Sequence, residues 1–301
     1  MSTSNQPQLP TSIEDLLAGL RRINPEEGLR RAAAFEPQAT DIFIVTYPKS
    51  GTTWLQQIVH GLRTQGSMDF DNISEVIPFF EMALDFGTDL QAPQPGHPRA
   101  FKTHLPWAML PKGARYIYVL RNPKDVLISH YHFLAGWRFE PGTVSLEDFA
   151  NEIFMFKGRL YERHFIPWWE RRHQPDTLLL CYEDLQEDLP KAVQRIAPFI
   201  GCPLDEELLA TVVEQSSFAF MQAHKHKFAV HSYARDLDQK YGLPTPDEIP
   251  PIVRTGRVGN HVEELPAVIS QKLDMIWQEE VGSRFGFRSY QALREALANM
   301  Y

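Results

Sequence analysis

The chain has 301 residues, with 30 Lys and Arg against 38 Asp and Glu and a formal net charge of −8. This acidic balance gives no basic footprint for nucleic acid, and no apolar run approaches the roughly 20 residues that a membrane-spanning helix needs. One large α/β domain is sufficient for this length, and the two cysteines, Cys181 and Cys202, cannot form a disulfide framework.

The N-terminal segment Met1–Pro10 is polar and has no apolar stretch of a secretory signal. Together with the low cysteine content, this favours a reducing, cytoplasmic location. We expect about the first 20 residues to be flexible. We expect residues 1–301 to form a single domain of this length. The chain contains no internal repeat and no low-complexity tract.

The first predicted element is a buried strand over Ile42–Thr46 that leads into a loop and a helix. The loop has the sequence Tyr47-Pro48-Lys49-Ser50-Gly51-Thr52-Thr53-Trp54, and a helix-like stretch follows over Leu55–Leu62. Such a loop directs several backbone N–H groups and the positive end of the helix dipole toward one point. Lys49 adds a full charge, the hydroxyl side chains add donors, and Gly51 permits close approach of the backbone. The pattern predicts a site for a phosphate-like anion.

This loop differs from a Walker P-loop, in which Gly-Lys-Ser/Thr closes the motif. Here Lys49 precedes Gly51, and Thr46 and Tyr47 occupy the place of the first glycine. No acidic partner for Mg²⁺ is evident beside the loop. A well-capped helix start rich in threonine is the structural alternative.

Further strands and helices alternate along the chain. Strands are predicted over Arg99–Thr103, Tyr116–Leu120 and Thr177–Tyr182, and amphipathic helices over Leu146–Phe156, Arg159–Arg172, Lys191–Ile200 and Leu265–Trp277. This alternation predicts an α/β fold, with a central parallel sheet flanked by helices. Ligands then bind beyond the carboxyl ends of the strands. Lys49, His104 and Arg121 each follow a predicted strand, so we expect them to converge there.

Two segments look irregular. Residues 91–98 carry three prolines, and residues 223–251 mix His, Lys and Asp with prolines and glycines. We predict that the second segment is a mobile flap and not a domain boundary.

Three more motifs follow the loop in order: Phe101-Lys102-Thr103-His104-Leu105-Pro106, Arg121-Asn122-Pro123-Lys124-Asp125-Val126 and Arg254-Thr255-Gly256-Arg257-Val258-Gly259-Asn260-His261. Together with the loop, they resemble the cytosolic sulfotransferases that use 3′-phosphoadenosine 5′-phosphosulfate (PAPS). The resemblance runs from about Ile42 to about His261. It implies a P-loop-kinase-like sulfotransferase fold and an enzyme that leaves adenosine 3′,5′-bisphosphate (PAP) as a product.

The resemblance also implies how the cofactor is held. Lys49 would meet the negative charge that develops at the 5′ end of PAPS. Arg121 and Ser129 match residues that bind the 3′-phosphate, for which a planar guanidinium is well suited. Contacts to adenine are implied for Trp54, Tyr182, Phe218 and either Ser216 or Ser217. The predicted cofactor residues are Lys49, Ser50, Gly51, Thr52, Thr53, Trp54, Arg121, Ser129, Tyr182, Ser216, Phe218, Arg254, Thr255 and Gly256.

Catalysis would need a base for the acceptor hydroxyl, because the sulfuryl group passes in line between two oxygens, as in phosphoryl transfer. His104 lies in the segment that resembles the family's catalytic segment, and an ordinary histidine pKa of about 6.5 suits proton abstraction at neutral pH. The predicted catalytic residues are His104, Lys49 and Lys102. No metal is expected, because lysines and N–H groups neutralise the charge and the His-x-His pairs lack the ligands that would complete a site.

The segment Ile77–Met82 resembles the acceptor-pocket segment of the family. The predicted acceptor residues are Phe79, Phe80, Trp107, Phe133 and Trp137. A mostly apolar pocket with one base predicts a small, mostly apolar acceptor, such as a phenol, a steroid or another lipid-like alcohol.

The last motif departs from the family's pattern. Thr255 stands where the usual lysine would add a cation, and Gly259-Asn260-His261 replaces the usual Gly-Asp-Trp. The C-terminal dimer motif of the family is not recognisable after His261. A homodimer is therefore possible, but the usual motif does not predict it. These departures indicate a divergent member of the family, such as a bacterial one.

Two other functions stay open. A nucleotide kinase or NTPase that uses the Lys49 loop would bind ATP with Mg²⁺. A non-catalytic module that binds an adenosine bisphosphate would bind without transfer, although His104 stands where transfer would need a base.

Overall fold

A computed structural model describes residues 8–23, 26–83, 85–155, 160–229, 231–251 and 256–300. At its centre is a four-stranded parallel sheet with the order β2-β1-β3-β4. The strands are β1 (Ile42–Thr46), β2 (Ala100–Thr103), β3 (Arg115–Leu120) and β4 (Thr177–Cys181). Ile42 of β1 lies opposite Ala100 of β2 on one side and Arg115 of β3 on the other. The predicted α/β fold with a central parallel sheet is confirmed.

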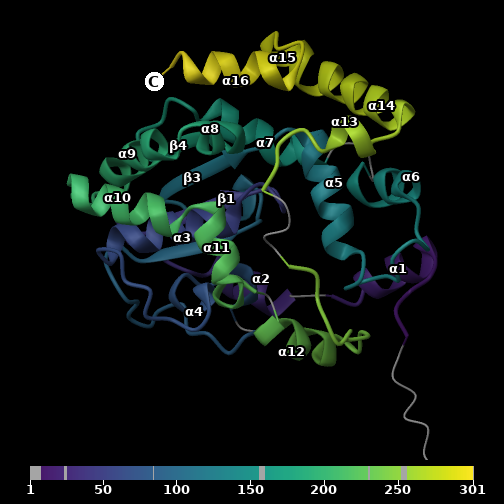
Figure 1. Cartoon of the computed structure of the whole chain (residues 1–301), viewed down its shortest axis with the longest axis horizontal. Helices are drawn as coiled ribbons and strands as arrows, with labels where there is room; N and C mark the ends of the chain where they lie inside the picture. The colour runs from purple at the N-terminus through teal and green to yellow at the C-terminus, as the bar shows by residue number, and fades with distance from the viewer. Residues whose placement is uncertain are drawn as a thin grey trace, which may run out of the picture.

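Helices flank both faces of this sheet (Figure 1). They are α1 (Ile13–Leu20), α2 (Glu26–Ala33), α3 (Thr52–Arg63), α4 (Ile73–Val76), α5 (Pro123–Leu134), α6 (Leu146–Phe149), α7 (Leu160–Glu170), α8 (Tyr182–Glu187), α9 (Leu189–Ile200), α10 (Glu206–Gln215), α11 (Phe218–Ala223), α12 (His231–Tyr241), α13 (His261–Glu264), α14 (Ala267–Trp277), α15 (Ser283–Phe285) and α16 (Tyr290–Ala298). Short turns are η1 (Phe80–Met82), η2 (Trp107–Met109), η3 (Ala150–Phe154), η4 (Lys225–Phe228) and η5 (Gln278–Gly282). In Figure 1, α14 to α16 run along one edge of the molecule and α12 lies on the opposite side.

The core is divided by the sheet into two apolar clusters. Because side chains alternate along a strand, Ile44 and Ile117 pack with α3 and α9 on one face. Phe43 and Tyr118 pack with the aromatic side chains of α7 on the other face. All four side chains are fully buried, so the strands read as the continuous apolar runs that are typical of a parallel sheet.

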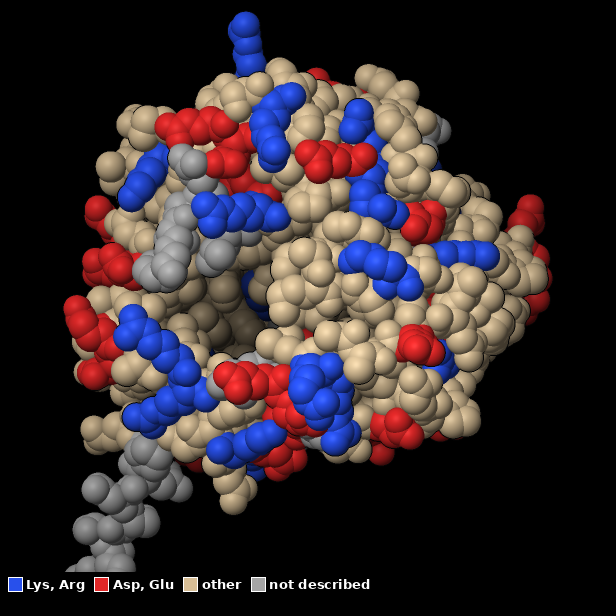
Figure 2. All heavy atoms as spheres, turned by 180° about the vertical axis from the view of Figure 1, so that it is seen from behind, with Lys and Arg blue, Asp and Glu red and all other residues tan. Residues whose placement is uncertain are grey.

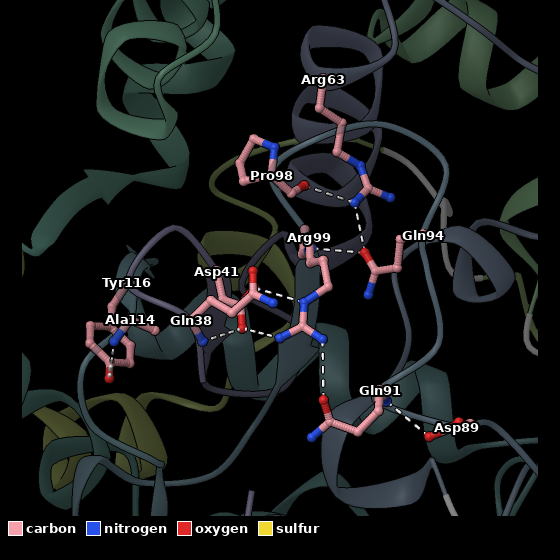
Figure 3. A network of polar contacts seen from close by, with 11 residues as sticks. Gln38, Asp41, Arg63, Asp89, Gln91, Gln94, Pro98, Arg99, Ala114 and Tyr116 are labelled. Carbon is pink, nitrogen blue, oxygen red and sulfur yellow. Dashed lines mark hydrogen bonds and ion pairs between the residues drawn. The ribbon is translucent and has the colours of Figure 1, made fainter. Parts of the chain in front are cut away.

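A polar network joins the amino ends of β1 and β2 (Figure 3). The buried carboxylate of Asp41 accepts from Arg99 Nε at 2.9 Å and from Nη2 at 2.6 Å. The amide oxygen of Gln94 accepts from the Ala100 N–H at 2.8 Å and from Arg63 Nη1 at 2.7 Å. Breaking a buried ion pair on one side typically costs about 3–5 kcal/mol, so this network fixes one end of the sheet. The predicted ligand site lies at the opposite end of the sheet, beyond the carboxyl ends of the strands.

Most predicted elements are confirmed, with ends shifted by a few residues. The predicted helices over Arg159–Arg172 and Leu265–Trp277 are α7 and α14, and residues 91–98 contain no helix or strand, as expected. The predicted helix over Leu146–Phe156 is observed as α6 followed by the π-helical turn η3.

The prediction that residues 223–251 are irregular is wrong, because they contain η4 and α12. α12 buries Ala234, Leu237 and Asp238, while Arg235 is exposed. The i, i+3, i+4 spacing places the buried residues on one helical face. The apolar stripe of α12 is short and lies among charged residues, so the sequence shows no clear amphipathic pattern there. The mobility of this segment stays a prediction.

Candidate active site

The loop after β1 has the geometry expected of an anion site. Lys49 adopts a φ of 70° and Gly51 a φ of 98°, and α3 begins directly afterwards at Thr52. A Cβ on Gly51 would lie 2.8 Å from Cδ2 of Tyr182, so both the conformation and the space require glycine. The first N–H groups of the 12-residue helix α3 point out of its amino end, where they suit a bound anion.

A cavity of about 560 Å³ opens beside this loop, at the carboxyl ends of the strands. Figure 2 shows a hollow on one face of the molecule with Lys and Arg side chains around its mouth. Residues predicted for the cofactor line the cavity: Lys49, Gly51, Thr52, Thr53, Trp54, Arg121, Ser129, Tyr182, Ser216, Phe218 and Gly256. It is also lined by the predicted catalytic and acceptor residues His104, Lys102, Phe79, Phe133 and Trp137. One cavity therefore brings the three predicted groups together.

His104, directly after β2, is held in one orientation. Its Nδ1 lies 2.9 Å from the carbonyl oxygen of Thr46. Since a carbonyl can only accept, Nδ1 carries the hydrogen and Nε2 carries the lone pair. Burial lowers the pKa of His104 to about 3, and the positive charge of Lys102 acts in the same direction. The imidazole is therefore neutral at physiological pH and able to accept a proton at Nε2.

The two lysines predicted to be catalytic lie against aromatic rings of the cavity wall. Lys49 Nζ is 3.8 Å from the centroid of the Phe133 ring, and Lys102 Nζ is 4.7 Å from that of Phe79. Phe79 also packs edge-on against His104, with the ring centroids 5.4 Å apart. The cations and the neutral histidine thus border the apolar part of the cavity, where charge interactions are strengthened by low polarity.

Arg121 follows β3 and faces the loop. Its Nη1 donates to the Lys49 carbonyl at 2.8 Å, and its guanidinium carbon lies 4.3 Å from the centroid of the Tyr182 ring. The side chain is buried, and its Nε has no hydrogen-bond partner among the described residues. A buried guanidinium with a donor left over suits an anion with several oxygens.

The aromatic side chains Trp54, Tyr182 and Phe218 also line the cavity. Trp54 Nε1 donates to the Ser216 carbonyl at 2.7 Å, and its ring meets Tyr182 edge-on with the centroids 5.4 Å apart. The Phe218 ring is 45% exposed, and a Cβ on Gly256 would overlap it. These rings provide apolar faces on which a flat heterocycle can pack.

Two residues predicted for the acceptor wall lie elsewhere, which corrects their assignment. An isolated parallel bridge pairs Phe79 with Lys102, so both face the cavity. Phe80 consequently points the other way, into the core, where its ring centroid is 5.0 Å from that of Phe43. Trp107 packs edge-on against Trp168 at 5.2 Å and is held in the aromatic cluster over the sheet.

Three residues of the predicted cofactor set are not seen at the cavity surface. Ser50 is fully buried under the loop, and Arg254 and Thr255 lie outside the described residues. Over the described part of the chain, no group of His, Cys, Asp or Glu is arranged to hold a metal ion. No helix within those same ranges is long and apolar enough to cross a membrane.

Sequence reasoning missed how the last motif is anchored. Asp125 of α5 accepts from the Gly259 N–H at 2.9 Å and from Nδ1 of His261 at 2.8 Å. Burial alone would raise the pKa of Asp125, but these hydrogen bonds outweigh it and the pKa is lowered. The position of Asp125 in a recognised motif was a usable indication of a role, but no spacing identified His261 as its partner.

Several apolar lining residues were also missed. They are Phe86, Leu185, Leu189, Met221 and Leu237; Met82 also lines the cavity, within the segment Ile77–Met82 that indicated an acceptor pocket. A single apolar side chain carries no local pattern that separates a cavity wall from a core.

The fold and the cavity define a class of protein: an α/β group-transfer enzyme with an anion-binding loop after its first strand and a neutral histidine beside an apolar wall. A family model described as "Sulfotransferase domain" matches residues 39–285. The chain therefore belongs to the sulfotransferase domain family, and the predicted resemblance is confirmed.

Sulfotransferases of two mammals are similar to this chain over most of its length. Sulfotransferase 1E1 of Bos taurus is 29% identical over 277 residues, which span 87% of this chain and 91% of that protein. Sulfotransferase 1B1 of Canis lupus familiaris is 31% identical over 85% of this chain and 88% of that protein.

Solved structures show the same fold. Retinol dehydratase in complex with androsterone and the inactive cofactor PAP matches with a TM-score of 0.70 at 20% identity, over 91% of this chain and 88% of that one. Mouse sulfotransferase SULT7A1 complexed with PAP matches with a TM-score of 0.66 at 23% identity, over 92% of this chain and 94% of that one.

Proposed function

We propose that this protein transfers the sulfuryl group of PAPS to a hydroxyl of a small, mostly apolar acceptor. The observation that carries the proposal is the convergence of Lys49, His104 and Arg121, each from the end of a different strand, on one cavity. Membership of the sulfotransferase family supports it, and so does the presence of PAP in the two structures named above.

The residues at the cavity fit PAPS. Nε of Arg121, which lines the cavity, is buried without a partner in the part of the chain that the structure describes, as expected for a donor that awaits an anion. The loop Lys49–Thr53 would hold the phosphosulfate end, and Arg121 with Ser129 would hold the 3′-phosphate. The adenine would lie among Trp54, Tyr182, Ser216 and Phe218.

When bound, PAPS supplies an activated sulfuryl group whose transfer leaves negative charge on a phosphate oxygen. Lys49 provides a fixed cation for that charge, and such preorganised stabilisation is usually the largest catalytic contribution. Lys102 would neutralise the sulfuryl oxygens. His104 takes the acceptor proton at Nε2, because its Nδ1 is committed to the Thr46 carbonyl.

The acceptor would lie against the apolar side of the cavity, formed by Phe79, Met82, Phe133, Trp137 and Leu237. Such a wall suits a phenol, a steroid or a lipid-like alcohol. Retinol dehydratase has been solved with androsterone and with retinol, two apolar molecules, which supports this acceptor class.

The test is transfer itself. The protein is incubated with PAPS and a panel of phenols and steroids, and sulfated products are detected by mass spectrometry. His104→Ala should lower turnover by roughly 10²-fold or more and leave PAP affinity, measured by calorimetry, nearly unchanged. Tight binding of Mg·ATP without PAP binding would indicate a kinase or NTPase instead. Binding of PAP without transfer to any acceptor would indicate a non-catalytic module.

We also propose a cytoplasmic location, in line with the two free, buried cysteines. Fractionation of the native cell tests this location. Light scattering of the purified chain decides between a monomer and a homodimer.

A further inference from the structure

The peptide groups on both sides of His104 are held by buried side chains from two other elements. The His104 N–H donates to Oε1 of Glu81 at 2.8 Å, and the His104 carbonyl accepts from Nε2 of His164 at 3.1 Å. Glu81 belongs to η1 and His164 to α7. Together with the bond from the imidazole to Thr46, these contacts fix both the backbone and the ring of the proposed base.

His164 can make its bond only in one tautomer. The His104 carbonyl can only accept, so Nε2 of His164 carries the hydrogen. Burial lowers the pKa of His164 to about 4, so the ring is neutral and its Nδ1 is an acceptor. The hydroxyl of Tyr118 lies 3.0 Å from Nδ1 and supplies the donor. Both ring nitrogens of His164 are therefore satisfied, one by Tyr118 and the other by the His104 carbonyl.

The ring of His164 is also fixed by packing. It stacks on Tyr118 with the centroids 5.6 Å apart, and Tyr118 in turn stacks on Trp168 at 5.2 Å. His164 is 6% exposed and Tyr118 is fully buried. Because stacking and hydrogen bonds hold its ring in place, His164 can fix the backbone of His104 relative to the aromatic core.

Glu81 holds the opposite side of the same residue. It is 6% exposed, and burial raises its pKa to about 7. One carboxyl oxygen is used by His104, and the other has no hydrogen-bond partner among the described residues. Burying a carboxyl group is costly. Glu81 is nevertheless buried where its carboxyl group accepts a hydrogen bond from the backbone N–H of His104, the proposed base.

Within the described chain, neither Glu81 nor His164 lines the cavity, so they have no direct access to an acceptor. We infer that Glu81 and His164 are positioning residues, which act through His104 by keeping its Nε2 directed at the acceptor hydroxyl. The inference rests on the proposed function. Because misplacement of a base by about 1 Å can cost on the order of 10²-fold in rate, the effect is large enough to measure.

A positioning role and a purely structural role predict different losses of activity on different acceptors. Phenol needs a base to lose its proton, whereas pentafluorophenol is already ionised at neutral pH and needs none. A variant that misplaces His104 should lose activity on phenol and keep it on pentafluorophenol. A variant that only unfolds part of the enzyme loses activity on both acceptors equally. The ratio of the two kcat values is therefore independent of the folded fraction.

The variants are His164→Leu, which removes both bonds, and His164→Gln, which keeps an N–H donor. His164→Leu should lower the kcat ratio of phenol to pentafluorophenol by roughly 10-fold or more, with unchanged affinity for PAP. His164→Gln should recover part of the ratio. Glu81→Leu should behave like His164→Leu, and Glu81→Gln should recover part of its loss. His60→Leu is the matched control, because His60 is equally buried but packs against Phe70; its ratio should equal that of the wild type.

An unchanged ratio in His164→Leu, with or without loss of stability, would overturn the inference. His104→Ala is measured in the same assay to separate this failure from failure of the proposed function. A low ratio in His104→Ala with a normal ratio in His164→Leu rejects the positioning role alone. A normal ratio in His104→Ala rejects His104 as the base, and with it the positioning role, but leaves sulfuryl transfer itself in place. The absence of transfer to either acceptor in the wild type rejects the proposed function.

Discussion

Replacing Arg121 with alanine should weaken the binding of PAP far more than the binding of adenosine 5′-phosphate, which lacks the 3′-phosphate. Arg121 is buried, stacks on Tyr182 and bonds to the Lys49 carbonyl. A phosphate that meets this guanidinium would be largely out of water, so its interaction would be little screened.

The size of the effect follows from this burial. A hydrogen bond to a charged group contributes about 1.5–3 kcal/mol, and loss of one partner of a buried charged pair costs about 2–5 kcal/mol. A loss of about 2–4 kcal/mol for PAP corresponds to a 30- to 900-fold increase in Kd, roughly. The lost bond to Lys49 disturbs the loop for both ligands, and at about 1 kcal/mol it weakens adenosine 5′-phosphate only severalfold.

Calorimetry with both ligands, on the wild type and on Arg121→Ala, measures the difference. Arg115→Ala is the matched control, because Arg115 begins the same strand, at the far end of the sheet from the cavity, and donates to the Phe199 carbonyl at 2.9 Å. It should leave both affinities unchanged. Equal losses for PAP and adenosine 5′-phosphate in Arg121→Ala would refute the assignment of the 3′-phosphate to this residue.

Three further outcomes are expected. Gly51→Ala should weaken PAP binding by roughly 10-fold or more, because its φ is 98° and the new Cβ would press on Tyr182; unchanged affinity would mean that the loop can rearrange. Burial lowers the pKa of His60 to about 4, so the unfolded chain binds more protons below about pH 6.5 and folded stability is lost as the pH falls toward 4. The Tm of His60→Leu relative to wild type should therefore rise as the pH falls from 7 to 5, by about 2 kcal/mol in stability, and a constant difference would contradict this. Hydrogen exchange over residues 223–251 should slow when PAP is added, and protection that is the same with and without PAP would reject the flap.

Sequence patterns could place the site because a parallel sheet has only one carboxyl edge. Lys49, His104 and Arg121 needed only three correct strand assignments to be brought together, and the strands before Lys49 and Arg121 are mostly apolar runs. The residues that support them could not be found in this way. His164 and Glu81 lie 60 and 23 positions from His104 in the sequence. His164 belongs to no recognised motif, and the segment Ile77–Met82, which contains Glu81, indicated an acceptor pocket and not a contact to His104.

A second limit of prediction from the sequence concerns neighbouring residues of the same polarity. Phe79 and Phe80 have the same side chain, and their assignment depends on which of them pairs with Lys102. That pairing is a tertiary contact between β2 and the residue that precedes η1, and hydrophobicity does not encode it. The helix α12 was hidden for a related reason, since its buried stripe is short and its remaining positions are charged.

The low pKa of His104 connects the base to the anion site. Burial is the main cause, and the positive charge of Lys102 adds to it, so a free base with a pKa of about 3 would hold a transferred proton poorly. An anion in the same cavity would neutralise the charge of Lys102. This removes one cause of the lowered His104 pKa and adds a negative charge that favours the protonated imidazole. Filling the anion site should therefore raise the pKa of His104 and make it a better base in the complex in which transfer can follow.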